Sequence, residues 1–215
     1  PFELWNWEHQ VGAPKEVLAA WETLDIRAEV ENISPWPVYF YNDATAACAA
    51  ELLLGNPRQH LDFLYIFIGS FIGGGVVLNG SLFPGRSGYA GAIAPLPVRR
   101  EDGQGYEQVL RRTSLYALAE KMREAGLDPE MLWREDGDWK TIGPILDDWL
   151  EVLCESLAVI ILSATAIIDF EAIVIDGGFP PEMREVVVAR VMEDLEKFDR
   201  QGLTAPAIVQ GQFGA

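Results

Sequence analysis

The chain has little cysteine, little histidine and few basic residues. Its 215 residues include two cysteines, two histidines and 16 lysines and arginines against 33 aspartates and glutamates, so its formal net charge is −17. The electric field of so negative a chain repels nucleic-acid phosphates, and the sequence has no basic arm or basic helix. We therefore expect no DNA binding by this segment alone, although an acidic domain can be joined to a separate DNA-binding domain.

The few residues that bind metals or form disulfides are widely spaced. Cys48 and Cys154 lie far apart in apolar surroundings, which predicts buried free thiols in a reducing compartment, hence a cytoplasmic protein. His9 and His60 have no ligand-like spacing. We expect both histidines at the surface.

No run of residues has the length of a membrane span. The longest apolar stretch, Leu157–Ile168, is interrupted by Ser163 and Thr165 and falls short of the roughly 20 residues that cross a bilayer. It predicts a core helix, and 49% hydrophobic composition is enough for a sizeable core. No signal peptide is recognisable at the start, and a chain that begins at Pro1 and ends in QGQFGA is expected to be an excised fragment.

Hydrophobic periodicity and breaker residues predict an α/β protein. We expect helices over Lys15–Glu29, Ala44–Leu54 (ended by Gly55), Thr113–Ala125, Pro144–Ala166 and Pro181–Phe198. We expect buried strands over Val38–Tyr41, Ala172–Asp176 and Ala207–Gln210. The acidic segment from Asp128 to Asp138, with Trp133 and Trp139, is expected to lie at the surface.

The stretch from Tyr65 to Pro95 is the most informative part of the sequence. An apolar run breaks into glycines and then resumes, which predicts a strand, a tight turn and a returning strand. The pattern places Gly69, Gly73, Gly74 and Gly75 where the backbone doubles back, so that a phosphate or a sugar hydroxyl can approach exposed amides. The alternative is a plain tight turn without ligand contact.

Two further positions are candidate binding sites. Asn42 and Asp43 lie between an expected strand and an expected helix, where open α/β folds bind ligands; the alternative is that they only cap the helix. Gly177 and Gly178 follow the strand Ala172–Asp176. The alternative for this pair is a strand-to-helix turn that needs positive φ.

These three features resemble the ROK family of bacterial sugar kinases and sugar-responsive repressors in order and spacing. The resemblance covers about Trp21 to Gly211 and is most specific in NDATAACAAE and IGSFIGGGVVLNGSLFPGRSGYAG. It implies an actin-like ATPase (ribonuclease-H-like) α/β fold of two lobes with a cleft. Residues 1–42 are then the remainder of the smaller N-terminal lobe, whose first part precedes Pro1, and residues 43–215 are the larger C-terminal lobe.

The resemblance also assigns roles to individual residues. It implies that Asp43 is the base that takes a proton from the sugar hydroxyl in a kinase and that Asn42 helps to hold the sugar. Gly69 lies in the region matched to sugar binding, and Tyr89 either stacks on a sugar ring or simply packs. The residues matched to phosphate or nucleotide binding are Gly69, Ser70, Gly73, Gly177 and Gly178.

The chain departs from the family pattern after the hairpin turn. Phe71 follows Ser70 where a small glycine is usual, which argues against ATP binding. Ala92 and Pro95 stand where family members carry a sugar-binding Glu and a zinc-binding His, and no cysteine cluster follows. We therefore expect no zinc and no other cofactor.

Two functions from different classes remain. The preferred one is the sugar-sensing domain of a ROK-type transcriptional regulator, a homodimer or tetramer that contacts DNA through a winged helix upstream of this chain. The alternative is a sugar kinase that uses Asp43 as catalytic base, with ATP and magnesium. A third possibility is a vestigial pocket in a domain that only dimerises.

Overall fold

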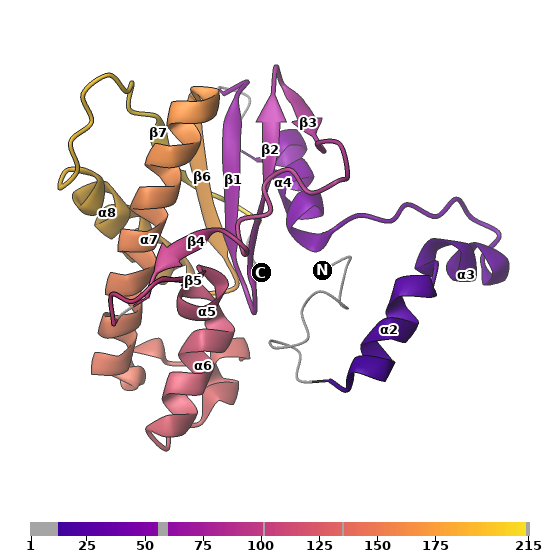
Figure 1. Cartoon of the computed structure of the whole chain (residues 1–215), viewed down its shortest axis with the longest axis horizontal. Helices are drawn as coiled ribbons and strands as arrows, with labels where there is room; N and C mark the ends of the chain where they lie inside the picture. Colours follow the sequence, from indigo (N-terminus) through magenta and orange to yellow (C-terminus); the bar gives the residue numbers. More distant parts are fainter. Residues whose placement is uncertain (1–12, 56–59, 101, 135, 214–215) are drawn as a thin grey trace.

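A mixed five-stranded sheet forms the centre of the protein (Figure 1). The computed structural model describes residues 13–55, 60–100, 102–134 and 136–213. The strand order is β3-β2-β1-β6-β7, in which β1 (Phe63–Ile68) pairs antiparallel with β2 (Ile72–Leu78), and β2 pairs antiparallel with β3 (Ser81–Phe83). On the other side of β1, β6 (Ala172–Gly177) and β7 (Ala207–Gln210) run parallel to it. The α/β prediction is confirmed.

The two faces of the sheet are covered by different helices. Alternate residues of β1 and β6, such as Phe63 and Tyr65, pack with Cys48 of α4 (Asp43–Leu54). The intervening residues, such as Ile66 and Ile173, belong to the main core with α7 (Pro144–Ile168) and α8 (Pro181–Leu195). Because helices cover both faces, all six residues of β6 are buried.

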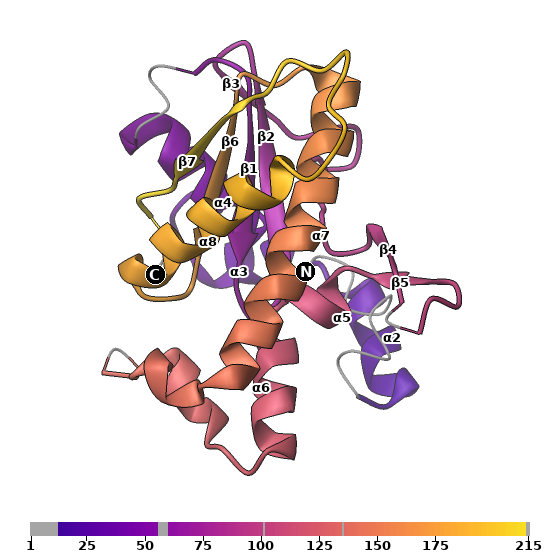
Figure 2. The same cartoon turned by 90° about the vertical axis from the view of Figure 1, so that its left-hand side faces the viewer.

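The remaining elements gather beside and below the sheet. A small antiparallel hairpin, β4 (Pro97–Arg99) and β5 (Tyr106–Gln108), leads into α5 (Leu110–Thr113) and α6 (Leu115–Glu124). Figure 2 shows α6 and the short helices η3 (Pro129–Trp133) and η4 (Trp139–Ile142) around the N-terminal end of α7. The hairpin β4–β5 and strand β3 were not predicted, because each strand has only three residues and shows no clear alternation.

Long, strongly patterned elements agree with the sequence. The predictions for α4, α7, β6 and β7 are confirmed to within two residues at each end, and Gly55 caps α4 by donating its N–H to the Glu51 carbonyl. Helix α6 begins later than expected because the Ser114 hydroxyl accepts a hydrogen bond from the Ala117 N–H and so caps the helix there. By length and composition alone α7 is able to cross a membrane. One face of the helix, which includes Leu153, Leu157 and Ile161, is fully buried in the main core.

The predictions for the N-terminal segment are wrong in two places. The expected single helix is divided into α2 (Lys15–Thr23) and α3 (Ile26–Ile33), because the Asp25 carboxylate accepts a hydrogen bond from the Ala28 N–H and starts a new helix. Residues 38–41 form no strand, and Tyr39 is 78% exposed, because no strand in the described part of the chain pairs with them. In Figure 1 α2 and α3 extend away from the sheet.

The glycine run occupies a strand rather than a turn. Only residues 69–71 form the turn, and Gly73, Gly74 and Gly75 pair with β1 inside β2. A Cβ at Gly75 would lie 2.5 Å from the Cys48 Cβ, and one at Gly74 would lie 2.3 Å from the Tyr65 carbonyl oxygen. The prediction that all these glycines line the turn is wrong. Three of them lie inside β2, where neighbouring parts of the protein pack so closely on the strand that a side chain has little room.

Three further expectations concern single side chains. Cys48 and Cys154 are free and fully buried, as predicted, and burial raises the pKa of each thiol to about 12. Trp133 is exposed, as expected, but Trp139 is only 4% exposed. The prediction for Trp139 is wrong because its ring packs edge-on against Phe179, with the centroids 6.2 Å apart.

Candidate functional site

One cavity of about 580 Å³ brings together most of the predicted site residues. It opens at the carboxyl end of β1, between the start of α4, the β1–β2 turn and the loop of residues 88–95. Of the predicted ligand contacts, it is lined by Asn42, Asp43, Gly69, Ser70, Gly73 and Tyr89. The three departures from the family pattern, Phe71, Ala92 and Pro95, line the same cavity.

The start of α4 supplies the polar wall of this cavity. Asn42 is the N-cap, and its Oδ1 accepts a long hydrogen bond of 3.4 Å from the Thr45 N–H. The Oδ1 of Asp43 accepts one of 2.8 Å from the Ala44 N–H. Within the part of the chain that the structure describes, the other carboxylate oxygen of Asp43 accepts no hydrogen bond. Helix capping and cavity lining therefore coexist here, and one carboxylate oxygen of Asp43 has no hydrogen-bond donor among the described residues.

The β1–β2 turn supplies the floor of the cavity and is held by backbone contacts. The Gly69 N–H donates to the Phe71 carbonyl at 2.9 Å, so it is engaged within the turn. The Gly69 carbonyl accepts a bond of 2.9 Å from the Leu115 N–H, which fixes the turn to α6. Phe71 is half-buried and packs on the main core while it lines the cavity. The turn thus lines the cavity with Ser70 and an aromatic ring, and the Gly69 amide is not available to a ligand.

The loop of residues 88–95 covers the cavity from the other side. Gly91 has φ of +83° and lies directly over β2, where a Cβ would come within 2.6 Å of the Gly75 nitrogen. Tyr89 is 39% exposed, while Ala92 and Pro95 offer no side-chain donor or acceptor. Gln108 of β5 also lines the cavity. It was missed because the sequence gives no recognisable signal for β5.

Gly177 and Gly178 lie at the same sheet edge but do not line this cavity. Gly177 pairs with Ile68, and the Gly178 N–H donates to the Ile68 carbonyl at 2.9 Å. Neither glycine has positive φ, so the alternative of a turn that needs such a conformation is wrong. Gly177 is required instead by packing, because a Cβ would lie 2.3 Å from the Phe179 ring.

A buried ion pair fixes the sheet edge next to these glycines. The fully buried Asp176 lies 2.9 Å from the Nε of Arg184, and it accepts hydrogen bonds from the Tyr65 hydroxyl at 3.1 Å and the Phe213 N–H at 3.2 Å. Burial, followed by the charge of Asp176, raises the pKa of Tyr65, so this hydroxyl stays protonated and donates. The pair therefore joins β1, β6, α8 and the C-terminal segment into one rigid unit. Sequence reasoning did not find it, since its members are far apart in the chain.

No metal centre is evident in the described ranges. They contain no group of three or more His, Cys, Asp or Glu side chains that is able to hold a metal ion. His60 is half-buried, and His9 lies outside the described residues. The residues that the resemblance matches to the zinc-binding cysteines form β4–β5 and α5. The expectation that the protein binds no zinc stays a prediction.

Comparisons with known proteins all point to the same family. The ROK family pattern matches residues 8–214. The xylose repressor of Bacillus subtilis is 28% identical over 78 residues, which are 36% of this chain and 20% of the repressor. The N-acetylmannosamine kinase of Vibrio cholerae serotype O1 is 28% identical over 153 residues, which are 69% of this chain and 53% of the kinase.

The fold of a solved relative extends over nearly the whole chain. The ROK hexokinase of Thermus thermophilus has a TM-score of 0.69 and 25% sequence identity, and the match covers 90% of this chain and 68% of the hexokinase. The two curated relatives just described are matched over about a fifth and about half of their own length. Repressors and sugar kinases are thus both among the relatives.

Proposed function

The chain belongs to the ROK family and has the actin-like α/β fold of its sugar kinases, and from this premise we propose that it is the sugar-sensing domain of a ROK-type transcriptional regulator. In this proposal the cavity at the start of α4 binds a sugar or a sugar derivative. A winged-helix domain outside this chain contacts DNA, and the regulator is a cytoplasmic homodimer or tetramer. The similarity to a xylose repressor supports the regulatory class.

The observation that carries the proposal is the contrast between the two walls of the cavity. Asn42 and Asp43 line one wall, and the second oxygen of Asp43 is available to a hydroxyl group. Ala92 and Pro95 line the cavity where the resemblance implies a Glu and a His. A cavity of about 580 Å³ has the size of a small-molecule site. Binding needs only part of the family's polar anchors, whereas phosphoryl transfer needs exact positioning of the substrate.

The position of Asn42 suggests how binding acts at a distance. The segment of residues 34–42 connects α3 to the body, and it ends at the N-cap of α4, beside the cavity. A sugar held by Asn42 and Asp43 therefore contacts the point where the N-terminal segment joins the sheet. We propose that the sugar favours one orientation of that segment and so shifts the population of a closed state, which changes the spacing of the DNA-binding heads.

A second candidate function rests on the free oxygen of Asp43. A carboxylate at a sugar hydroxyl is able to accept its proton as the bond to phosphorus forms, with ATP and magnesium as donor. The similarity to N-acetylmannosamine kinase over 69% of the chain supports this alternative. Phe71 in the wall beside Ser70 counts against it, because an aromatic ring narrows the turn that would face the phosphates.

The full-length protein, with the sequence that flanks this chain, separates the two functions. Calorimetric titration with xylose, glucose and N-acetylmannosamine identifies which of these sugars the protein binds. Operator binding and ATP hydrolysis are then measured with and without that sugar. The sensor proposal expects sugar-sensitive operator binding, no turnover, and sugar affinity reduced at least about tenfold by Asp43→Asn. Asp148→Asn, an exposed carboxylate on α7, is the matched control and should leave affinity unchanged. Sugar-dependent turnover that Asp43→Asn abolishes would establish the kinase instead.

A further inference from the structure

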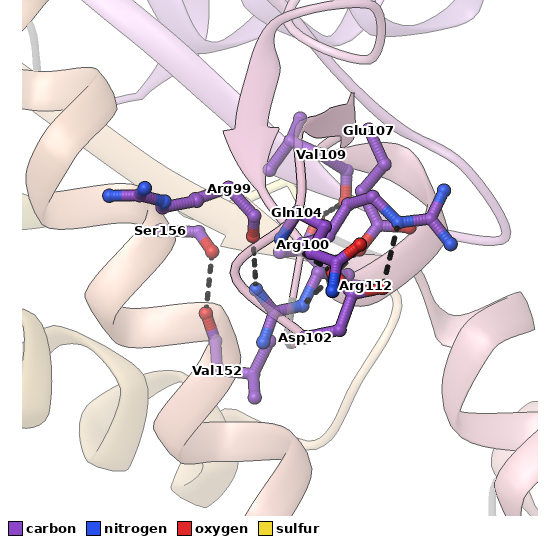
Figure 3. Close-up of polar contacts among 10 residues, drawn as sticks. Arg99, Arg100, Asp102, Gln104, Glu107, Val109, Arg112, Val152 and Ser156 are labelled. Carbon is purple, nitrogen blue, oxygen red and sulfur yellow. Dashed lines mark hydrogen bonds and ion pairs between the residues drawn. The ribbon is translucent and has the colours of Figure 1, made fainter.

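A second cavity, of about 390 Å³, lies between the β4–β5 hairpin, helices α5 and α6, and Val152 of α7. Its lining is almost entirely charged. Figure 3 shows most of these side chains and the hydrogen bond that joins Arg112 to the backbone of Arg99. The charged lining residues are Arg100, Asp102, Glu107, Arg111, Arg112 and Lys121.

The charge of this cavity is opposite to that of the chain. Among the described residues of its lining four cations face two carboxylates, whereas acidic residues outnumber basic ones 33 to 16 in the whole sequence. A quarter of all lysines and arginines therefore gather around one small hollow. Like charges held together in this way repel one another, and an anion bound among them removes that repulsion.

Two of the four cations are committed to the structure of the hairpin. Arg112 donates a hydrogen bond of 3.0 Å from Nη1 to the Arg99 carbonyl, and its Nε lies 4.0 Å from a Glu107 oxygen. Arg100 lies at the rim, where its Nε is 3.7 Å from an Asp102 oxygen and both side chains are about half exposed. These contacts place guanidinium groups around the opening and account for both carboxylates of the lining.

The other two cations lack such partners. In the ranges that the structure describes, neither Arg111 of α5 nor Lys121 of α6 has a carboxylate within 4.0 Å. Both line the cavity, and neither supports the backbone through a side-chain hydrogen bond to a described residue. Among the described residues of the lining, these two side chains carry the positive charge that no carboxylate pairs with. A ligand that carries about two negative charges balances them.

We propose that this cavity is an anion site that binds the phosphate group of a small phosphorylated metabolite, separate from the sugar cavity. A phosphate monoester carries up to two negative charges near neutral pH, and guanidinium groups present paired N–H donors that match its oxygens. The volume admits one such group with a small organic part. An extended polyanion such as nucleic acid is disfavoured, because beyond the hollow it meets the field of a chain with net charge −17.

The site is separate from the first cavity but joined to it by one strand. Glu107 lines the anion cavity and the next residue of β5, Gln108, lines the sugar cavity. Adjacent residues of a strand point to opposite faces, so β5 forms a wall shared by the two cavities. The anion proposal rests on the charges of its own cavity and holds whether or not the first cavity binds a sugar.

The test is titration of the 215-residue chain, and of the full-length protein, with inorganic phosphate and with glycerol 2-phosphate at constant ionic strength. Backbone amide shifts in residues 104–112, measured by NMR, report occupancy of the cavity. The double variant Arg111→Gln/Lys121→Gln should weaken phosphate binding at least about tenfold. The matched variant Arg134→Gln/Lys197→Gln removes one exposed arginine and one exposed lysine from ion pairs elsewhere and should leave the affinity unchanged.

Three results would overturn the proposal. Equal weakening by both double variants would mean that only the net charge matters. Amide shifts with chloride as large as those with phosphate would mean that the hollow does not distinguish phosphate from other anions. A short DNA duplex that displaces phosphate and binds more tightly would mean that the surface recognises nucleic acid. Circular dichroism of each variant shows that the hairpin and helices are retained, so that loss of binding is not loss of fold.

Discussion

The two cavities are built on supports of different kinds. The cavity at the start of α4, which is the proposed sugar cavity, rests on the central sheet, where Gly73, Gly74 and Gly75 allow α4 and the loop of residues 88–95 to approach the backbone closely. The anion cavity rests on a two-stranded hairpin and the surface of two short helices, and its charged side chains are mostly exposed or half-buried. The first site is therefore shaped by packing and the second by charge. We therefore expect substitutions of the glycines beneath the first cavity to act on stability, and substitutions of Arg111 and Lys121 in the second to act on binding without loss of the fold.

The largest expected effect comes from the buried ion pair at the sheet edge. Asp176→Ala leaves Arg184 buried without its carboxylate, and we expect the free energy of unfolding to fall by about 3–5 kcal/mol. Urea unfolding followed by circular dichroism measures this change. The control variant Asp136→Ala removes the exposed partner of Arg134 and should leave the free energy of unfolding unchanged. Similar losses in both variants would contradict the view that this edge is the rigid part of the molecule.

A smaller loss of stability should follow from filling the space beneath the sugar cavity. Gly75→Ala places a Cβ 2.5 Å from that of Cys48, so α4 must shift, and we expect a loss of about 1–3 kcal/mol. Gly178→Ala is the control, because it has ordinary φ and its nearest neighbour, the Cδ1 of Leu115, would lie 3.8 Å away. Thermal unfolding of the two variants separates a packing requirement from a general cost of replacing glycine. Equal shifts in melting temperature would contradict the packing explanation.

The same contrast explains what the sequence was able to predict. Long periodic segments such as Pro144–Ile168 were found because one apolar face repeats over many turns. The residue pattern pointed to Asn42, Asp43 and the glycine turn as candidate sites, and the resemblance then assigned them roles. The role of the glycines in β2 was misjudged, since the sequence cannot show which helix packs on a strand. The anion cavity was not foreseen because its cations become neighbours only through the pairing of β4 with β5 and the turn into α5.

Alkaline pH should weaken the core under the sugar cavity. Burial raises the pKa of Cys48 to about 12 from an ordinary value of 9.0, so its thiol stays protonated in the folded protein after it ionises in the unfolded chain. The stabilising contribution is complete below pH 9 and is lost progressively as pH rises from there towards 12. Between pH 8 and 10 we expect the free energy of unfolding to fall by about 1 kcal/mol more in the wild type than in Cys48→Ala. Parallel pH profiles would contradict this assignment.

The smallest effect tests whether the two cavities communicate through β5. Because Glu107 and Gln108 are consecutive and line different cavities, we expect an anion that displaces Glu107 to displace Gln108 in the wall of the other cavity as well. Saturating phosphate should therefore change sugar affinity by about fivefold, and sugar should change phosphate affinity by the same factor, since coupling free energy is reciprocal. Titration of each ligand in the presence and absence of the other measures both factors. The Arg111→Gln/Lys121→Gln variant should abolish the effect of phosphate on sugar binding, whereas independent affinities in the wild type would mean that β5 is a rigid partition.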